Sequence, residues 1–133
     1  MSIKQTVAKF VNKHAETSEH HPAESLRTHY YKTKQEDASQ AVRNILSSMS
    51  GSVIRGESKE RGELSADLDN GKAFLVATAV TVKPFRTAVD FSVSMNSSIV
   101  PFGLGYPSAK IEFLYRELNK ELSFIGTGLA DKL

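Results

Sequence analysis

Two stretches of the chain place their apolar side chains at the spacing of an amphipathic α-helix. In residues 34–49 the apolar positions recur every three or four residues, and Thr33 with Glu36 forms a capping box at the start. Residues 107–122 repeat the pattern, and Pro107 suits a first helical position because its missing N–H costs nothing there. The pattern therefore predicts two helices, each with one buried face.

Elsewhere in the chain, apolar and polar positions alternate with the period of a β-strand. Residues 85–95 do so most clearly, which is typical of a strand with one buried face. Residues 72–82 are apolar at nearly every position, so we expect this strand to be central in its sheet or covered on both sides. Asn70-Gly71 ahead of it favours a tight hairpin turn. The five predicted strands are residues 26–32, 53–57, 64–68, 72–82 and 85–95.

An N-terminal segment precedes this core. Its apolar residues recur at helical spacing, with lysines largely away from them, which predicts an amphipathic helix over residues 3–16. Residues 17–22 interrupt the pattern and are interpreted as a linker. We therefore expect a helical arm with its linker in residues 1–22, and one domain with a short C-terminal tail in residues 23–133. The apolar stripe that the arm could present to a partner comprises Ile3, Val7, Phe10 and Val11.

The order of these elements predicts the fold class. Four successive strands favour a meander, so we expect an α+β fold with a curved antiparallel sheet of about five strands and two packing helices, β-α-β-β-β-β-α. Across residues 26–122 this order resembles the TATA-binding-protein-like, or helix-grip, architecture, in which a curved sheet wraps a long helix. The chain is also similar to small uncharacterised cytosolic proteins of Gram-positive bacteria. Neither resemblance carries a functional residue over to this chain.

The composition limits the chemistry available to the chain. None of its 133 residues is cysteine, which excludes disulfide bonds, thiolate catalysis and cysteine-ligated metals. The 17 basic and 15 acidic residues give a net charge of +2 without a dense basic stripe, so we expect no nucleic acid among its partners. No apolar stretch approaches the ~18 residues of a membrane span and no signal peptide is evident, so we expect a cytoplasmic protein without stable membrane insertion.

Motifs for catalysis or for cofactor binding are incomplete. His20 and His21 are adjacent, and adjacent side chains point in different directions, so a solvated linker is favoured over a metal site. Gly103 and Gly105 precede a helix but lack a phosphate-binding lysine, which favours a plain turn. No Gly-x-Ser-x-Gly elbow marks a serine nucleophile. We therefore expect no catalytic residue, no metal and no cofactor.

A ligand site is conceivable between the sheet and a helix. Arg86 and Asp90 lie four residues apart on the polar face of one strand, and if His29 shares that face a polar pocket forms that could bind an anion. The alternative is that the polar residues face solvent and the aromatic ones fill the core. The candidate ligand-binding residues are Arg86, Asp90, His29, Tyr31, Phe91 and Tyr115.

Three functional classes stay open. The favoured one is a non-enzymatic binding or interaction module that uses the sheet–helix cleft or the N-terminal helix, with a small apolar or amphipathic ligand or a protein as its partner. The second is an oligomerising structural or regulatory protein, such as a homodimer that exchanges its N-terminal helix. The third is an enzyme with a polar pocket near Arg86 and Asp90.

Overall fold

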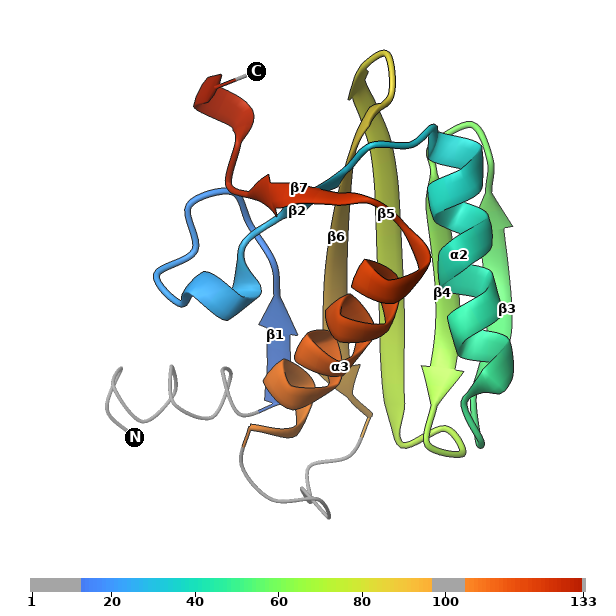
Figure 1. Ribbon diagram of the computed structural model, residues 1–133. Helices are drawn as coiled ribbons and strands as arrows, with labels where there is room; N and C mark the ends of the chain where they lie inside the picture. The colour runs from blue at the N-terminus through green and yellow to red at the C-terminus, as the bar shows by residue number, and fades with distance from the viewer. Residues whose placement is uncertain (1–12, 97–104, 133) are drawn as a thin grey trace.

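An antiparallel sheet with helices on one face forms the body of the molecule (Figure 1). The computed structural model describes residues 13–96 and 105–132, and within them the sheet has seven strands. The strands are β1 (His14–Glu16), β2 (His29–Tyr31), β3 (Val53–Ser58), β4 (Glu63–Leu68), β5 (Ala73–Lys83), β6 (Arg86–Met95) and β7 (Phe124–Thr127). Their order is β3-β4-β5-β6-β2-β7, with β1 also beside β6. The predicted α+β class and antiparallel sheet are confirmed, but the sheet has more strands than the five expected.

Both long helices lie on the same face of the sheet (Figure 1). They are α2 (Gln35–Ser48) and α3 (Tyr106–Glu121), each within a residue of its predicted bounds, and two short 3-10 helices, η1 (Glu24–Leu26) and η2 (Ala130–Lys132), complete the described elements. The buried side chains of α2 lie at the predicted helical spacing, from Ala38 to Leu46. Those of α3 include Ile111, Leu114 and Leu118.

The hairpin between β4 and β5 forms where the sequence predicts it. Asn70 has a φ of 60° and Gly71 a φ of 87°, both in the left-handed region that asparagine and glycine tolerate best. The N–H of Gly71 donates to the carbonyl of Leu68 at 3.1 Å. The turn sets the register in which β4 and β5 pair from Glu63 opposite Thr78 to Leu68 opposite Ala73.

The first strand corrects the predicted N-terminal helix. Residues 14–16 extend along β6, with Ala15 opposite Val93, instead of ending a helix over residues 3–16. Pairing with a neighbouring strand satisfies their backbone groups, and this tertiary contact outweighs the local helical pattern. The sheet thus begins inside the predicted arm of residues 1–22. Residues 1–12, with the stripe from Ile3 to Val11, lie outside the described part of the chain.

The last strand was also not predicted. Residues 124–127 were expected to be a tail, yet they pair with β2, with Gly126 opposite Tyr30. Gly126 and Gly128 weaken the strand signal of this segment, because glycine is depleted in strands.

The space between the helices and the sheet is filled by side chains. Phe91 from β6 and Tyr115 from α3 are 2% and 3% exposed, and their rings meet edge to face with centroids 4.9 Å apart. Leu75, Leu114 and Leu118 are completely buried beside them. The expected sheet–helix cleft is therefore occupied by packed core, with Phe91 and Tyr115 inside it.

Candidate functional site

The two faces of the sheet differ in what covers them. Side chains that face the helices, such as Leu75 and Val93, are fully buried. The intervening side chains point to the opposite side, on which neither α2 nor α3 lies (Figure 1). We call this surface the open face and define it by the outward residues of β4, β5 and β6: Glu63, Ser65, Asp67, Phe74, Val76, Thr78, Val80, Asp90, Ser92 and Ser94.

An apolar stripe runs along the middle of the open face. On β4, and on β6 from Asp90 to Ser94, the outward residues are polar, as expected for a sheet with one solvated face. Ala88 of β6, opposite Val80, is buried. On β5 they include Phe74, Val76 and Val80, which we call the β5 stripe, and Val80 is 45% exposed. The prediction that this strand is central is confirmed by its place between β4 and β6. Neither α2 nor α3 covers its second apolar face, on which Phe74 and Val76 are partly exposed and Thr78 separates them from Val80. This face is therefore a candidate contact surface.

A partly buried carboxylate lies beside this stripe. β1 and β2 pair with the same edge of β6, and the chain between them leaves the sheet at the level of Asp90. The two threonines at this break, Thr17 and Thr28, each donate a hydroxyl hydrogen bond of 2.6 Å to Asp90 Oδ1. Thr17 Oγ1 also accepts the backbone N–H of Phe91 at 3.0 Å, so its position is fixed from two directions. The break in the strand therefore builds a defined polar site.

The electrostatics of the site favour a positively charged ligand. Burial raises the pKa of Asp90 above its ordinary value, the threonine hydroxyls oppose that shift, and Glu19 and Glu16 reinforce it. Asp67, by contrast, forms an ion pair with Arg55 at 2.6 Å between Oδ2 and Nε. Within residues 13–96 and 105–132, no lysine or arginine forms such a pair with Asp90.

Asp90 forms part of a recess of about 300 Å³ on the open face. The lining of the recess includes Glu16, Thr17, Val76, Thr78, Asp90 and Ser92. Its acidic side and its apolar side match the side chain of lysine or arginine, which has an apolar stem and a charged head. The site can therefore bind a cation and at the same time bury part of the aliphatic chain that carries it.

His29 does not contribute to this recess, which corrects the predicted polar pocket. β2 pairs with β6 so that His29 lies opposite Val89, and directly opposite residues share a face of the sheet. His29 and Tyr31 thus face the helices, whereas Asp90 faces the other side. Arg86 lies at the end of β6, beside the turn that joins it to β5. The sequence could not show this separation because it depends on the register between strands far apart in the chain.

On the helix face, His29 belongs to a hydrogen-bonded aromatic cluster. Its ring stacks on Tyr115 with centroids 3.5 Å apart, and Nδ1 lies 3.0 Å from the hydroxyl oxygen of Tyr31. The Tyr31 hydroxyl donates to Asn119 at 2.6 Å, and the Tyr115 hydroxyl donates to the Val89 carbonyl at 2.7 Å. Burial lowers the pKa of His29 to about 4, so the ring is neutral at pH 7. The polar groups of this cluster meet one another's hydrogen-bonding needs, which indicates that the cluster has a structural role.

Two further recesses are weaker candidates for a ligand site. One of about 630 Å³ lies between α2 and the β3–β4 turn, where Arg43 and Glu57 pair with each other across it. The other, of about 320 Å³, lies beside α3 above His29 and is lined in part by Glu112 and Arg116. Among their described lining residues, no carboxylate accepts hydrogen bonds from two hydroxyl groups, as Asp90 does. The open face therefore remains the stronger candidate.

Of the two adjacent histidines considered as metal ligands, His21 takes part in local structure. His21 Nδ1 accepts the backbone N–H of Ala23 at 2.9 Å, which stabilises the turn before η1. In the part of the chain that the structure describes, no group of three histidine, aspartate or glutamate side chains could hold a metal ion. None of the described helices is long and apolar enough to cross a membrane.

Comparison of the chain with models of known protein families, with curated proteins and with solved structures finds no match. The two resemblances drawn from the sequence therefore stay predictions, and the functional argument rests on the geometry of the open face.

Proposed function

We propose that this chain is a non-enzymatic interaction module that binds a basic segment of a protein partner on the open face of its sheet. The observation that carries the proposal is the Asp90 carboxylate, which lies beside the apolar β5 stripe and has no cationic partner among the described residues. The proposal keeps the class favoured from the sequence but moves the contact surface from the filled cleft to the opposite side of the sheet.

The free energy of such binding has two sources. A lysine or arginine head group that reaches Asp90 gains a charge-assisted hydrogen bond, which is stronger than a neutral one. The desolvation of Asp90 has already occurred during folding, so the partner meets a carboxylate that is partly stripped of water. Apolar side chains of the same segment bury the β5 stripe, which adds the hydrophobic contribution.

An enzymatic role has less support. Asp90 is bonded to two threonine hydroxyls, and the buried histidine that was expected beside it faces the helices. A general acid–base pair needs its members within hydrogen-bonding reach of one substrate. Asp90 and His29 lie on opposite faces of the sheet and do not meet this condition.

A second copy of the chain is one specific partner with the required chemistry. Residues 1–13 contain Lys4, Lys9 and Lys13 and no acidic residue, and an apolar stripe alternates with these lysines. The segment leads directly into β1, whose His14 bonds to Ser94 of the open face at 2.7 Å. We therefore propose exchange of residues 1–13 between copies as the second candidate function.

The experiment uses a fluorescein-labelled peptide of residues 1–13 and measures its fluorescence polarisation on titration with the full chain. We expect saturable binding that weakens about tenfold or more with Asp90→Asn, because the substitution removes the charge and keeps the shape. Glu112→Gln, which removes a carboxylate from α3 on the helix side, is the matched control and leaves the affinity unchanged. A peptide with glutamine in place of its three lysines should not bind.

The outcomes separate the two candidates. Binding of the peptide together with a dimer mass in native mass spectrometry, reduced by Asp90→Asn, supports exchange between copies. Binding of the peptide by a chain that stays monomeric supports recognition of a basic segment in another protein. Equal affinity of the Asp90→Asn and unsubstituted chains rejects the open face as the site.

A further inference from the structure

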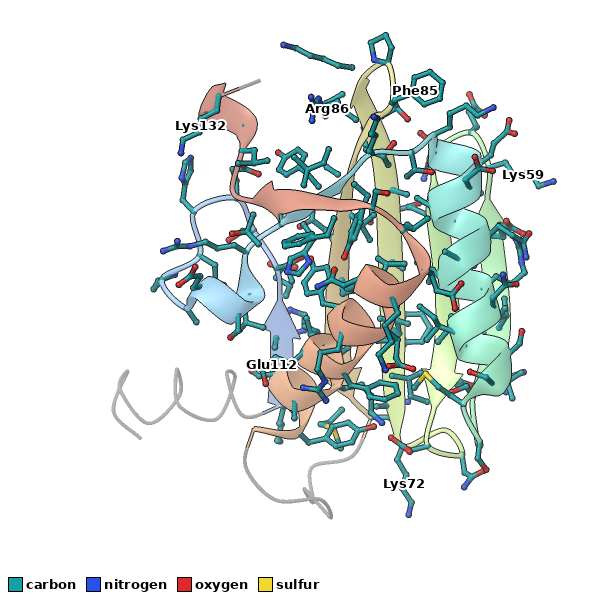
Figure 2. All side chains as sticks on the ribbon, viewed as in Figure 1. Lys59, Lys72, Phe85, Arg86, Glu112 and Lys132 are labelled. Carbon is teal, nitrogen blue, oxygen red and sulfur yellow. The ribbon has the colours of Figure 1, made fainter. Side chains whose placement is uncertain are left out.

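The hairpin between β5 and β6 extends beyond the ends of both long helices (Figure 1). Residues 80–85 are all exposed, and Phe85 in the turn is 58% exposed. Figure 2 shows Phe85 and Arg86 together at this end of the molecule, with the side chain of Phe85 directed away from the sheet. We call residues 82–86, Val-Lys-Pro-Phe-Arg, the hairpin tip.

The residue at the apex of the tip is unfavourable for the free protein. Phe85 has a φ of 57°, which is uncommon for a bulky side chain and is adopted most readily by glycine. Its ring is also exposed to water, so neither backbone conformation nor burial accounts for phenylalanine at this position. A contact outside the described part of the molecule would account for it.

The tip and the segments connected to its base carry several charged residues. The segment after β2 is fixed to the base of the hairpin, because Thr87 Oγ1 donates to the Thr33 carbonyl at 2.7 Å and the N–H of Gln35 donates to Thr81 Oγ1 at 3.0 Å. The side chain of Gln35 in turn donates to the carbonyl of Lys59 at 3.1 Å, which places the β3–β4 turn at the same end. The basic residues of these segments are Lys32, Lys34, Lys59, Arg61, Lys83 and Arg86, and their acidic residues are Glu36, Asp37, Glu57, Glu60 and Glu63.

The basic residues of the tip and of the segment fixed to its base form no ion pair among the described residues. No ion pair in residues 13–96 and 105–132 involves Lys32, Lys34, Lys83 or Arg86. Lys59, unlike these four, lies in a recess that is also lined by Glu36, Asp37, Glu57 and Glu63. At the opposite end of β5, by contrast, Lys110 forms an ion pair with Asp69 at 3.3 Å. The positive charge beside the exposed phenylalanine thus comes from Lys83 and Arg86 in the tip and from Lys32 and Lys34 on the segment fixed to its base.

We propose that the hairpin tip docks on the surface of an anionic lipid bilayer, with Phe85 entering the headgroup region. An exposed apolar apex flanked by the long, flexible side chains of Lys83 and Arg86 suits a broad and deformable negative surface better than a shaped protein pocket. An apolar anchor together with several basic side chains supplies the two signals that stable peripheral binding needs. Such docking does not span the membrane, and it goes beyond the proposed binding of a basic segment on the open face.

The chain contains no tryptophan, so Phe85→Trp introduces a single fluorescent reporter at the apex. We expect its emission to shift to shorter wavelength with vesicles of phosphatidylserine and phosphatidylcholine, and to stay unchanged with phosphatidylcholine alone. Val53→Trp, placed at an exposed position on β3, is the control and should not shift. An unchanged Phe85→Trp emission with the anionic vesicles overturns the proposal.

Sedimentation of the full chain with the same vesicles tests whether the basic residues of the tip contribute to vesicle binding. Arg86→Glu should weaken binding about tenfold, whereas Lys72→Glu, which makes the same charge change at the far end of the sheet (Figure 2), should not. Phe85→Ser should also release the chain. Equal losses of binding from Arg86→Glu and Lys72→Glu would assign the attraction to net charge and reject the tip. Release of the chain by Phe10→Ser, while Phe85→Ser still binds, would assign membrane binding to the N-terminal segment and also reject the tip.

Discussion

The two faces of the sheet are built from the same strands but differ in how their side chains are packed and hydrogen-bonded. On the helix face, each buried polar group of the His29 cluster has a partner, and apolar side chains fill the space to the helices. On the open face, a partly buried carboxylate has only hydroxyl partners among the described residues, and neither α2 nor α3 covers the apolar stripe. The comparison shows that one face is packed and internally hydrogen-bonded, while the other exposes the groups on which the proposed binding rests.

The largest expected effect is on the free energy of unfolding when one apolar side chain is truncated on each face. Phe91→Ala should lower the free energy of unfolding by about 3–5 kcal/mol, because it leaves a cavity in the core. Val80→Ala on the β5 stripe should lower it by less than about 0.5 kcal/mol, because the side chain is already exposed. Urea denaturation of the two variants measures both values. A large loss from Val80→Ala would mean that the stripe is part of the core.

A smaller effect is expected from protonation on the helix face. The pKa of His29 is lowered to about 4 in the folded chain from an ordinary value of 6.5, so between these values the unfolded chain binds more protons. The stability from the neutral ring is therefore present above pH 6.5 and is lost as the pH falls towards 4. Allowing for partial screening by solvent, we expect a loss of about 1 kcal/mol between pH 7 and pH 4.5.

The matched variant for this pH dependence is His29→Phe, which keeps a ring against Tyr115 and removes the titratable group. Thermal unfolding of both proteins at a series of pH values should show a shallower decline for the variant. Identical pH profiles would show that His29 does not carry the effect.

The smallest effect concerns the carboxylate of the open face. Because burial raises the pKa of Asp90 in the folded chain, the ionised form opposes folding at pH 7, and this cost grows as the pH rises above 3.8. Asp90→Asn should therefore slightly increase the free energy of unfolding at pH 7, although it weakens peptide binding. Asp67→Asn, which breaks the pair with Arg55, should not increase it. If Asp90→Asn destabilises the chain instead, the ionised carboxylate does not oppose folding, and this account of Asp90 is wrong.

Local patterns predicted the elements whose signals are contained in short stretches of sequence. The periodicity of α2 and α3 and the Asn70-Gly71 turn each depend on neighbours within a few residues, and the structure confirms them. The apolar character of β5 on both faces also pointed to its central place. Short strands that gain stability only from a distant partner, β1 and β7, carry no such local signal.

The candidate site was only partly predictable for the same reason. Asp90 was singled out as a polar residue on a strand, but its partners Thr17 and Thr28 lie 73 and 62 residues away in sequence. Their approach depends on β1 and β2 pairing with one edge of β6 and on the break between them. A sequence pattern gives the period of each strand but not the register between strands, so it could not show that His29 and Asp90 face opposite sides.

The most direct test of the open face is a two-dimensional NMR titration of the isotope-labelled full chain with the unlabelled peptide of residues 1–13. We expect the amide resonances of Val76, Thr78 and Ser92 to shift on binding, while those of Val42 and Leu114 on the helices stay in place. The Asp90→Asn chain should show smaller shifts at the same peptide concentration. Shifts confined to the helices, or none at any concentration, would contradict the assignment of the open face as the binding surface.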